Sequence, residues 1–106
     1  MHYNIELCKT GMFLGVLKLE LFFPENGSLK EKRYYLRSIK DRLKGNFNVS
    51  VAETDHHDLW QRSQIAVACV GMEKQAVEET LTKVRNFLDR NYPEFILSVS
   101  LEYLKV

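Results

Sequence analysis

Five basic residues recur at helical spacing in the first half of the chain. They follow one another at intervals of three, four, three and four residues and would form one stripe on a helix: Lys30, Arg33, Arg37, Lys40 and Lys44. Like charges at this spacing repel one another, so a stripe without acids is typical of a surface that binds anions. The phosphate backbone of a nucleic acid is the natural partner. The alternative is a solvated helix face beside acids from another element, for example Glu78 and Glu79 of the second helix, or beside a second subunit.

The charge of the whole chain makes this stripe stand out. The net charge is only +1, which argues against general coating of nucleic acid. Residues 28–45 nevertheless contain seven basic and two acidic residues, whereas the rest of the chain contains eight basic and twelve acidic residues. The positive charge is therefore concentrated in one segment.

Four consecutive residues, Asp55-His56-His57-Asp58, are of the types that bind zinc or manganese. Adjacent residues cannot all reach one ion, and no distant His, Cys or Asp cluster supplies the remaining ligands. The Asp-His-His string also occurs in a phosphoesterase superfamily, but those chains are far longer and carry further acidic motifs that are missing here. We therefore expect a polar connection between strands, with no metal and no cofactor.

No set of nucleophile, base and orienting residue can be named, so we predict that the protein is not an enzyme. Cys8 and Cys69 have no metal-ligand spacing, which favours reduced thiols in a cytoplasmic protein, with Cys69 buried. Trp60 is expected to be a core or interface anchor, because partner aromatics for base stacking are lacking. Tyr34 and Tyr35 are expected at the edge of the core, without a chemical role.

The periodicity of apolar residues predicts the elements that position these side chains. Alternation predicts strands over residues 13–23, 47–54, 65–70 and 95–104. Helical spacing predicts one helix from Leu29 to a left-handed cap at Gly45-Asn46, and a second over residues 73–91. Ser28 and Glu31 have the spacing of a capping box at the start of the first helix.

The order β-α-β-β-α-β predicts a ferredoxin-like α+β fold, with a four-stranded antiparallel sheet and both helices on one face. A length of 106 residues fits one domain, which we assign to residues 12–106. Residues 1–11 form an N-terminal extension, either an added edge strand or a loose segment, because Tyr3, Ile5 and Leu7 alternate. No segment has the roughly 18 apolar residues of a membrane span, so we expect no membrane partner.

The two faces of the predicted sheet should differ. The face under the helices should be buried at Leu17, Leu19, Leu21, Leu36, Ile39, Leu43, Val49, Val51, Ile65, Val67, Leu81, Val84, Leu88, Val99 and Leu101. The open face should present an apolar surface made of Leu14, Val16, Phe22, Ala52, Ala66, Ala68, Val70, Ile96 and Leu104. A surface of this kind predicts self-association into a dimer or larger homo-oligomer.

Four strings of residues resemble one protein family: F-L-G-V-L-K-L-E-L (13–21), S-L-K-E-K-R (28–33), F-N-V-S-V-A-E (47–53) and D-L-W-Q-R (58–62). Together they are similar to the YlxP-like family, domain of unknown function 503, over about residues 12–104. Members typically begin near Met12, so residues 1–11 depart from the pattern. The resemblance implies a ferredoxin-like fold in a bacterial cytoplasmic protein. Gene neighbours of the family, which encode transcription-termination and translation-initiation factors, imply a link to RNA or the ribosome.

Two functional hypotheses follow. The first is a non-enzymatic accessory module that binds RNA or a ribosomal surface through the basic stripe. The second is an oligomeric structural or small-ligand-sensing domain whose basic stripe lies at a subunit interface. Salt-dependent binding to RNA or ribosomes distinguishes them.

Overall fold

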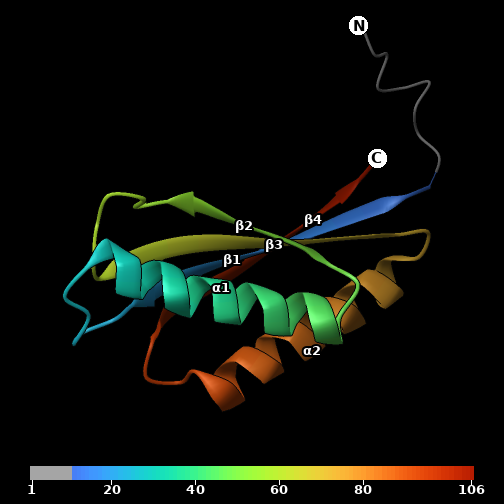
Figure 1. Ribbon diagram of the computed structural model, residues 1–106. Helices are drawn as coiled ribbons and strands as arrows, with labels where there is room; N and C mark the ends of the chain where they lie inside the picture. The colour runs from blue at the N-terminus through green and yellow to red at the C-terminus, as the bar shows by residue number, and fades with distance from the viewer. Residues whose placement is uncertain (1–10) are drawn as a thin grey trace, which may run out of the picture.

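Four strands and two helices follow one another in the predicted order in the computed structural model, which describes residues 11–106. They are β1 (Phe13–Phe22), α1 (Leu29–Asn46), β2 (Ser50–Asp55), β3 (Arg62–Gly71), α2 (Lys74–Asn91) and β4 (Ile96–Lys105). The sheet order is β2-β3-β1-β4, and all neighbouring strands are antiparallel. Both helices cover one face of the sheet (Figure 1), which confirms the ferredoxin-like fold. Of the expected extension, residues 1–10 lie outside the described part of the chain.

The core lies between the helices and the two central strands. Leu17, Leu19 and Leu21 of β1 and Ile65 and Val67 of β3 are fully buried. The helices add two matching sets of buried residues: Lys32, Leu36, Ile39 and Leu43 from α1, and Val77, Leu81, Val84 and Leu88 from α2. Four residues that were predicted to be buried are only half-buried: Val49, Val51, Val99 and Leu101. Val51, Val99 and Leu101 belong to β2 and β4, the edge strands of the sheet, and Val49 directly precedes β2.

The start of α1 is capped as predicted, with one difference. The Ser28 Oγ accepts a hydrogen bond from the Glu31 N–H at 3.1 Å. The Glu31 carboxylate accepts from the Gly27 N–H at 3.2 Å, one residue before the position that a capping box uses. The predicted left-handed cap at Gly45-Asn46 is wrong: both residues belong to α1, and the extended Phe47 is the cap. The side-chain amide of Asn46 donates a hydrogen bond to the Arg42 carbonyl within the last turn of the helix.

The open face of the sheet is divided into an apolar and a polar end. At one end Leu14 lies between Val70 and Leu104, and more than half of each of the latter two side chains is exposed. At the other end Glu20 lies between Gln64 and Ser98. A register shift of β1 against β4 between Glu20 and Leu21 pairs Leu21 with Ile96. The prediction of Ile96 on the open face is therefore wrong: it packs against the core, and Leu97 is exposed.

Candidate functional site

The basic stripe lies along the flank of α1 that faces β2, an edge strand. Four of its five residues line a shallow groove of about 330 Å³. The groove residues are Arg33, Leu36, Arg37, Lys40, Asp41 and Lys44 from α1 and Glu53 from β2. Lys30, one turn before Arg33, is exposed outside the groove. The structure therefore brings four of the five predicted residues to one concave surface.

The cations of this stripe are not neutralised within residues 11–106. None of the five makes a hydrogen bond or an ion pair there. The acids proposed as their counter-charges interact along their own helix: Glu78 pairs with Lys74 at 3.6 Å, and Glu79 accepts from Gln75 at 3.5 Å. Glu78 and Glu79 are therefore not the counter-charges of the stripe, and the acids that line its groove are Asp41 and Glu53.

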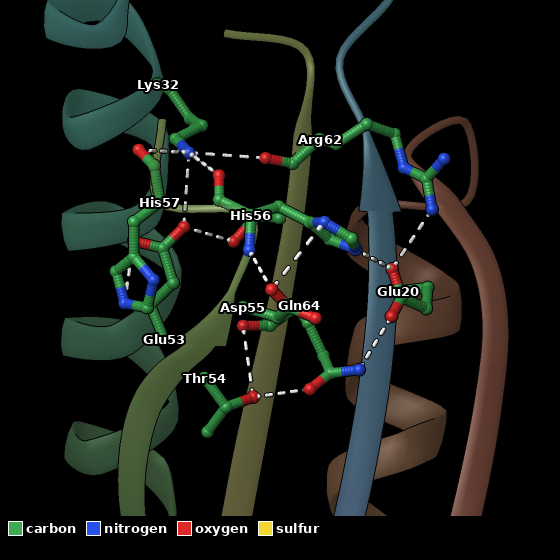
Figure 2. Close-up of polar contacts among 10 residues, drawn as sticks. Glu20, Lys32, Glu53, Thr54, Asp55, His56, His57, Arg62 and Gln64 are labelled. Carbon is green, nitrogen blue, oxygen red and sulfur yellow. Dashed lines mark hydrogen bonds and ion pairs between the residues drawn. The ribbon is translucent and has the colours of Figure 1, made fainter. Parts of the chain in front are cut away.

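A buried lysine lies beside the groove and was not identified from the sequence. Lys32 is 1% exposed, and its Nζ donates to the carbonyls of His56, His57 and Arg62 at 2.8, 3.2 and 3.2 Å. The Nζ also forms a 3.2 Å ion pair with Glu53 (Figure 2). The Glu53 carboxylate also accepts a hydrogen bond from the Ser63 hydroxyl. These bonds compensate for the cost of burying an ammonium group, and they attach α1 to the β2–β3 connection.

A second set of polar contacts continues from this connection onto the open face of the sheet (Figure 2). Glu20 accepts from Gln64 at 2.7 Å and Arg62 at 3.2 Å, and its carboxylate lies 3.2 Å from His56 Nε2. Partial burial alone would raise the pKa of Glu20, but the hydrogen bonds from Gln64 and Arg62 and the electrostatic interactions with His56 and Arg62 lower it overall. Glu20 is therefore held as a carboxylate.

The side chains of the Asp55–Asp58 loop do not come together at one point, and two of them, His56 and His57, contact residues of this network. His56 has a φ of 63°, in the left-handed region, where its side chain reaches Glu20. Asp55 Oδ1 accepts from the His56 N–H at 2.7 Å, and His57 lies 4.0 Å from Glu53. Within residues 11–106, no three His, Cys, Asp or Glu side chains come together as a metal site would require.

The tip of the same connection presents apolar side chains to solvent. Trp60 is 55% exposed and Leu59 48% exposed, so Trp60 is not a core anchor, and its role as an interface anchor stays a prediction. The backbone here is fixed, because the Trp60 carbonyl accepts from the buried Asn26 side chain and the Gln61 carbonyl accepts from the Phe23 N–H. Tyr34 is also exposed, whereas Cys69 is buried as predicted.

The four strings that carry the family resemblance meet at this network. Glu20 comes from the first string, Lys32 from the second, Glu53 from the third and Arg62 from the fourth. Each of these residues bonds to at least one partner in another string. The network thus joins the four strings, which are separate in the sequence, at one place in the fold.

No helix among the described residues is long and apolar enough to cross a membrane.

The structure resembles that of a dimeric protein of unknown function with a ferredoxin-like fold from Bacteroides fragilis, with a TM-score of 0.58 and 14% identity over 92% of this chain and 98% of that one. It also aligns with a putative antibiotic biosynthesis monooxygenase from Bacillus cereus, with a TM-score of 0.49 and 14% identity over 90% of each chain.

Sequence comparison gives a closer relationship. The chain is 37% identical to the uncharacterized protein YlxP of Bacillus subtilis over 81 residues, which cover 76% of this chain and 87% of that protein. Residues 14–101 match the family model described as protein of unknown function DUF503. The chain therefore belongs to the DUF503 family, as the four strings indicated.

Proposed function

We propose that this protein is a non-enzymatic accessory module of the bacterial cytoplasm that binds RNA, free or on the ribosome, through the basic stripe. The observation that carries the proposal is the concentration of Arg33, Arg37, Lys40 and Lys44 around one groove, with no ion pair to any residue within 11–106. Unpaired cations on one surface attract a polyanion and release its counterions on binding.

The size of the groove supports a strand of nucleic acid as the ligand. With a rise of about 1.5 Å per residue in an α-helix, Arg33 and Lys44 are about 16 Å apart along α1. Phosphates of one stacked nucleic-acid strand follow one another at about 3.4 Å along its axis, so this length corresponds to about five phosphates. The groove lies between α1 and β2, which is an edge strand of the sheet. Leu36 at its base is apolar, so the surface offers phosphate contacts with little readout of base sequence.

The test is a charge reversal of Arg33→Glu with Arg37→Glu. Binding of a fluorescent single-stranded RNA, measured by anisotropy over a range of salt concentrations, should show a log–log slope of about −3 for the unaltered protein, because four cations neutralise phosphates at about −0.7 each. The double variant should lose detectable binding at moderate salt. Its stability should stay within about 1 kcal/mol, since both residues are exposed.

The matched control is Lys83→Glu with Arg90→Glu on α2, which changes the net charge equally at two exposed positions without ion pairs among residues 11–106. This variant should bind RNA nearly as well as the unaltered protein. Equal losses in both variants would show that only net charge matters, and unchanged binding in the α1 variant would refute the proposal.

A second candidate function, an oligomeric structural or ligand-sensing domain, is favoured by one observation. The apolar end of the open face exposes Val70 and Leu104, and the similar protein from Bacteroides fragilis is described as dimeric. Val70→Lys with Leu104→Lys should then give a monomer in light scattering while RNA binding persists. If the α1 double variant changes the oligomer and leaves RNA retention unaltered, the basic stripe belongs to a subunit interface instead.

A further inference from the structure

An aromatic hollow lies on the flank of α1 opposite the basic stripe. It has a volume of about 270 Å³ and is lined by Phe23, Pro24, Glu25, Asn26, Tyr35, Glu94 and Phe95. Three rings form its wall: Phe23 and Tyr35 are stacked with centroids 5.5 Å apart, and Phe95 lies 5.0 Å from Phe23 and 5.9 Å from Tyr35. No basic side chain contributes to the lining.

Three polar groups of this hollow are acceptors without partners among residues 11–106: the Asn26 Oδ1 and the carboxylates of Glu25 and Glu94. Asn26 is 5% exposed, and because its Nδ2 donates to the Trp60 carbonyl, the orientation of the amide is fixed. The Asn26 Oδ1 is then a buried acceptor with no hydrogen-bond partner among residues 11–106. Glu25 and Glu94 are exposed at the same hollow, and neither carboxylate has a hydrogen bond or ion pair in that range. A buried acceptor of this kind lowers stability unless a donor reaches it.

The walls of the hollow are fixed in place before any ligand arrives. The Asn26 N–H closes a turn onto the Phe23 carbonyl at 3.1 Å, and the Gln61 side chain donates to the Pro24 carbonyl at 2.9 Å. On the other side, the Phe22 N–H donates to the Phe95 carbonyl at 2.8 Å. A preformed site loses less conformational entropy when it binds.

We propose that this hollow binds an organic cation, an ammonium or guanidinium group on an apolar stem. Aromatic faces attract cations and pack against an apolar stem. The two exposed carboxylates, Glu25 and Glu94, supply the opposite charge. The aromatic rings and the two carboxylates are independent features and favour the same chemistry, whereas an anion would meet two carboxylates and no basic side chain. This site is separate from the RNA-binding stripe and does not depend on it.

The experiment uses three small probes that share one ring and differ in charge. Two-dimensional NMR of the full chain should show saturable shifts at Asn26, Tyr35 and Phe95 with benzylamine, which is cationic at neutral pH. Benzyl alcohol should bind more weakly and benzoate should not bind. Equal shifts with benzoate, or no saturable shift with benzylamine at millimolar concentration, would overturn the proposal.

Variants test the role of the two carboxylates. Glu25→Gln with Glu94→Gln should weaken benzylamine binding by roughly tenfold, because each exposed charge pair contributes a few-fold. The matched control, Glu73→Gln with Glu79→Gln at the start of α2, should bind as the unaltered protein does. Equal affinities in all three proteins would exclude the carboxylates and refute the proposed chemistry.

A last comparison identifies the source of the cation. A short peptide with blocked ends and one central lysine is titrated beside benzylamine under the same conditions. Tighter binding of the peptide assigns the hollow to a basic side chain of a polypeptide, and tighter binding of benzylamine assigns it to a small free amine. Either result supports the shared chemistry, and saturable binding of neither refutes it.

Discussion

The two helices have the same length and the same pattern of buried positions, yet they do different work. Both span 18 residues and contact the sheet through four positions spaced by four, three and four residues. In α2 all four are aliphatic, beginning with Val77, whereas in α1 the first is Lys32. All four buried positions of α2 therefore stabilise the fold through apolar packing. At the start of α1, Lys32 instead forms hydrogen bonds that hold the β2–β3 connection in place.

The exposed charges of the helices differ in the same way. In α2, Lys74 pairs with Glu78 and Arg85 lies 4.0 Å from Asp89, each one turn apart. In α1 the basic stripe has no such partners among residues 11–106. Pairs one turn apart stabilise a helix slightly, whereas an unpaired stripe destabilises it slightly. The arrangement on α1 is therefore one that local helix stability does not explain.

The largest effect is expected at the position where the helices differ most. Lys32→Met should lower the free energy of unfolding by about 3–5 kcal/mol, because it leaves three carbonyls and the Glu53 carboxylate without their donor. Val77→Ala, at the matching position of α2, should cost only about 2 kcal/mol for lost packing. Urea denaturation measures both. If Lys32→Met is as stable as the unaltered protein, the Lys32 ammonium makes no net contribution to the free energy of unfolding, and the proposed difference between the two helices is refuted.

A smaller effect is expected where α2 lies directly on β1. A Cβ at Gly15 would lie 2.6 Å from both Leu81 Cδ1 and Val77 Cγ1, so Gly15→Ala should destabilise the protein by about 1–3 kcal/mol. Gly45 in α1 has no atom within 4 Å of such a Cβ, and Gly45→Ala should stabilise the protein by about 0.5–1 kcal/mol. Thermal denaturation gives both signs, and a stabilising Gly15→Ala would show that the packing of α2 on β1 is loose.

The smallest effect concerns pH. Because the pKa of Glu20 is lowered in the folded protein, its contribution to stability is present above the ordinary value of 4.5 and is lost as the pH falls below that value through the folded pKa. Glu20→Gln should therefore be less stable than the unaltered protein at neutral pH, and the difference should shrink on acidification. Glu79→Gln on α2 is the control. A constant difference across the pH range would show that the Glu20 contacts do not depend on its charge.

The architecture was predictable because the apolar period of each element points to one shared layer, as Leu17, Leu19 and Leu21 illustrate. The exchange of Ile96 and Leu97 was not predictable, because a register shift between strands leaves no mark on the alternation of either strand. Gly45 was misread as a cap because glycine favours caps but is tolerated in a last turn whose carbonyls find other donors, here from Asn46.

The network around Lys32 was hidden for a different reason. A lysine in a basic segment is read as exposed, although Lys32, Leu36, Ile39 and Leu43 have the same spacing as the buried residues of α2, and that spacing was the available signal. The basic stripe was predictable because it depends only on helical geometry. Its lack of partners was not, because the positions of Glu78 and Glu79 depend on how α2 packs.

The Lys32 contacts also have a consequence for the order in which parts of the protein fold. Its three carbonyl acceptors lie 24, 25 and 30 residues along the chain, beyond β2 and at the start of β3. An ammonium group cannot be buried until its acceptors are in place, and they are in place only once β2 and β3 have paired in register. The chain between Lys32 and these carbonyls loses conformational entropy when its ends come together, and this loss precedes the formation of the hydrogen bonds. We therefore expect the junction of α1 with the β2–β3 connection to form late in folding, after β2 and β3 have paired.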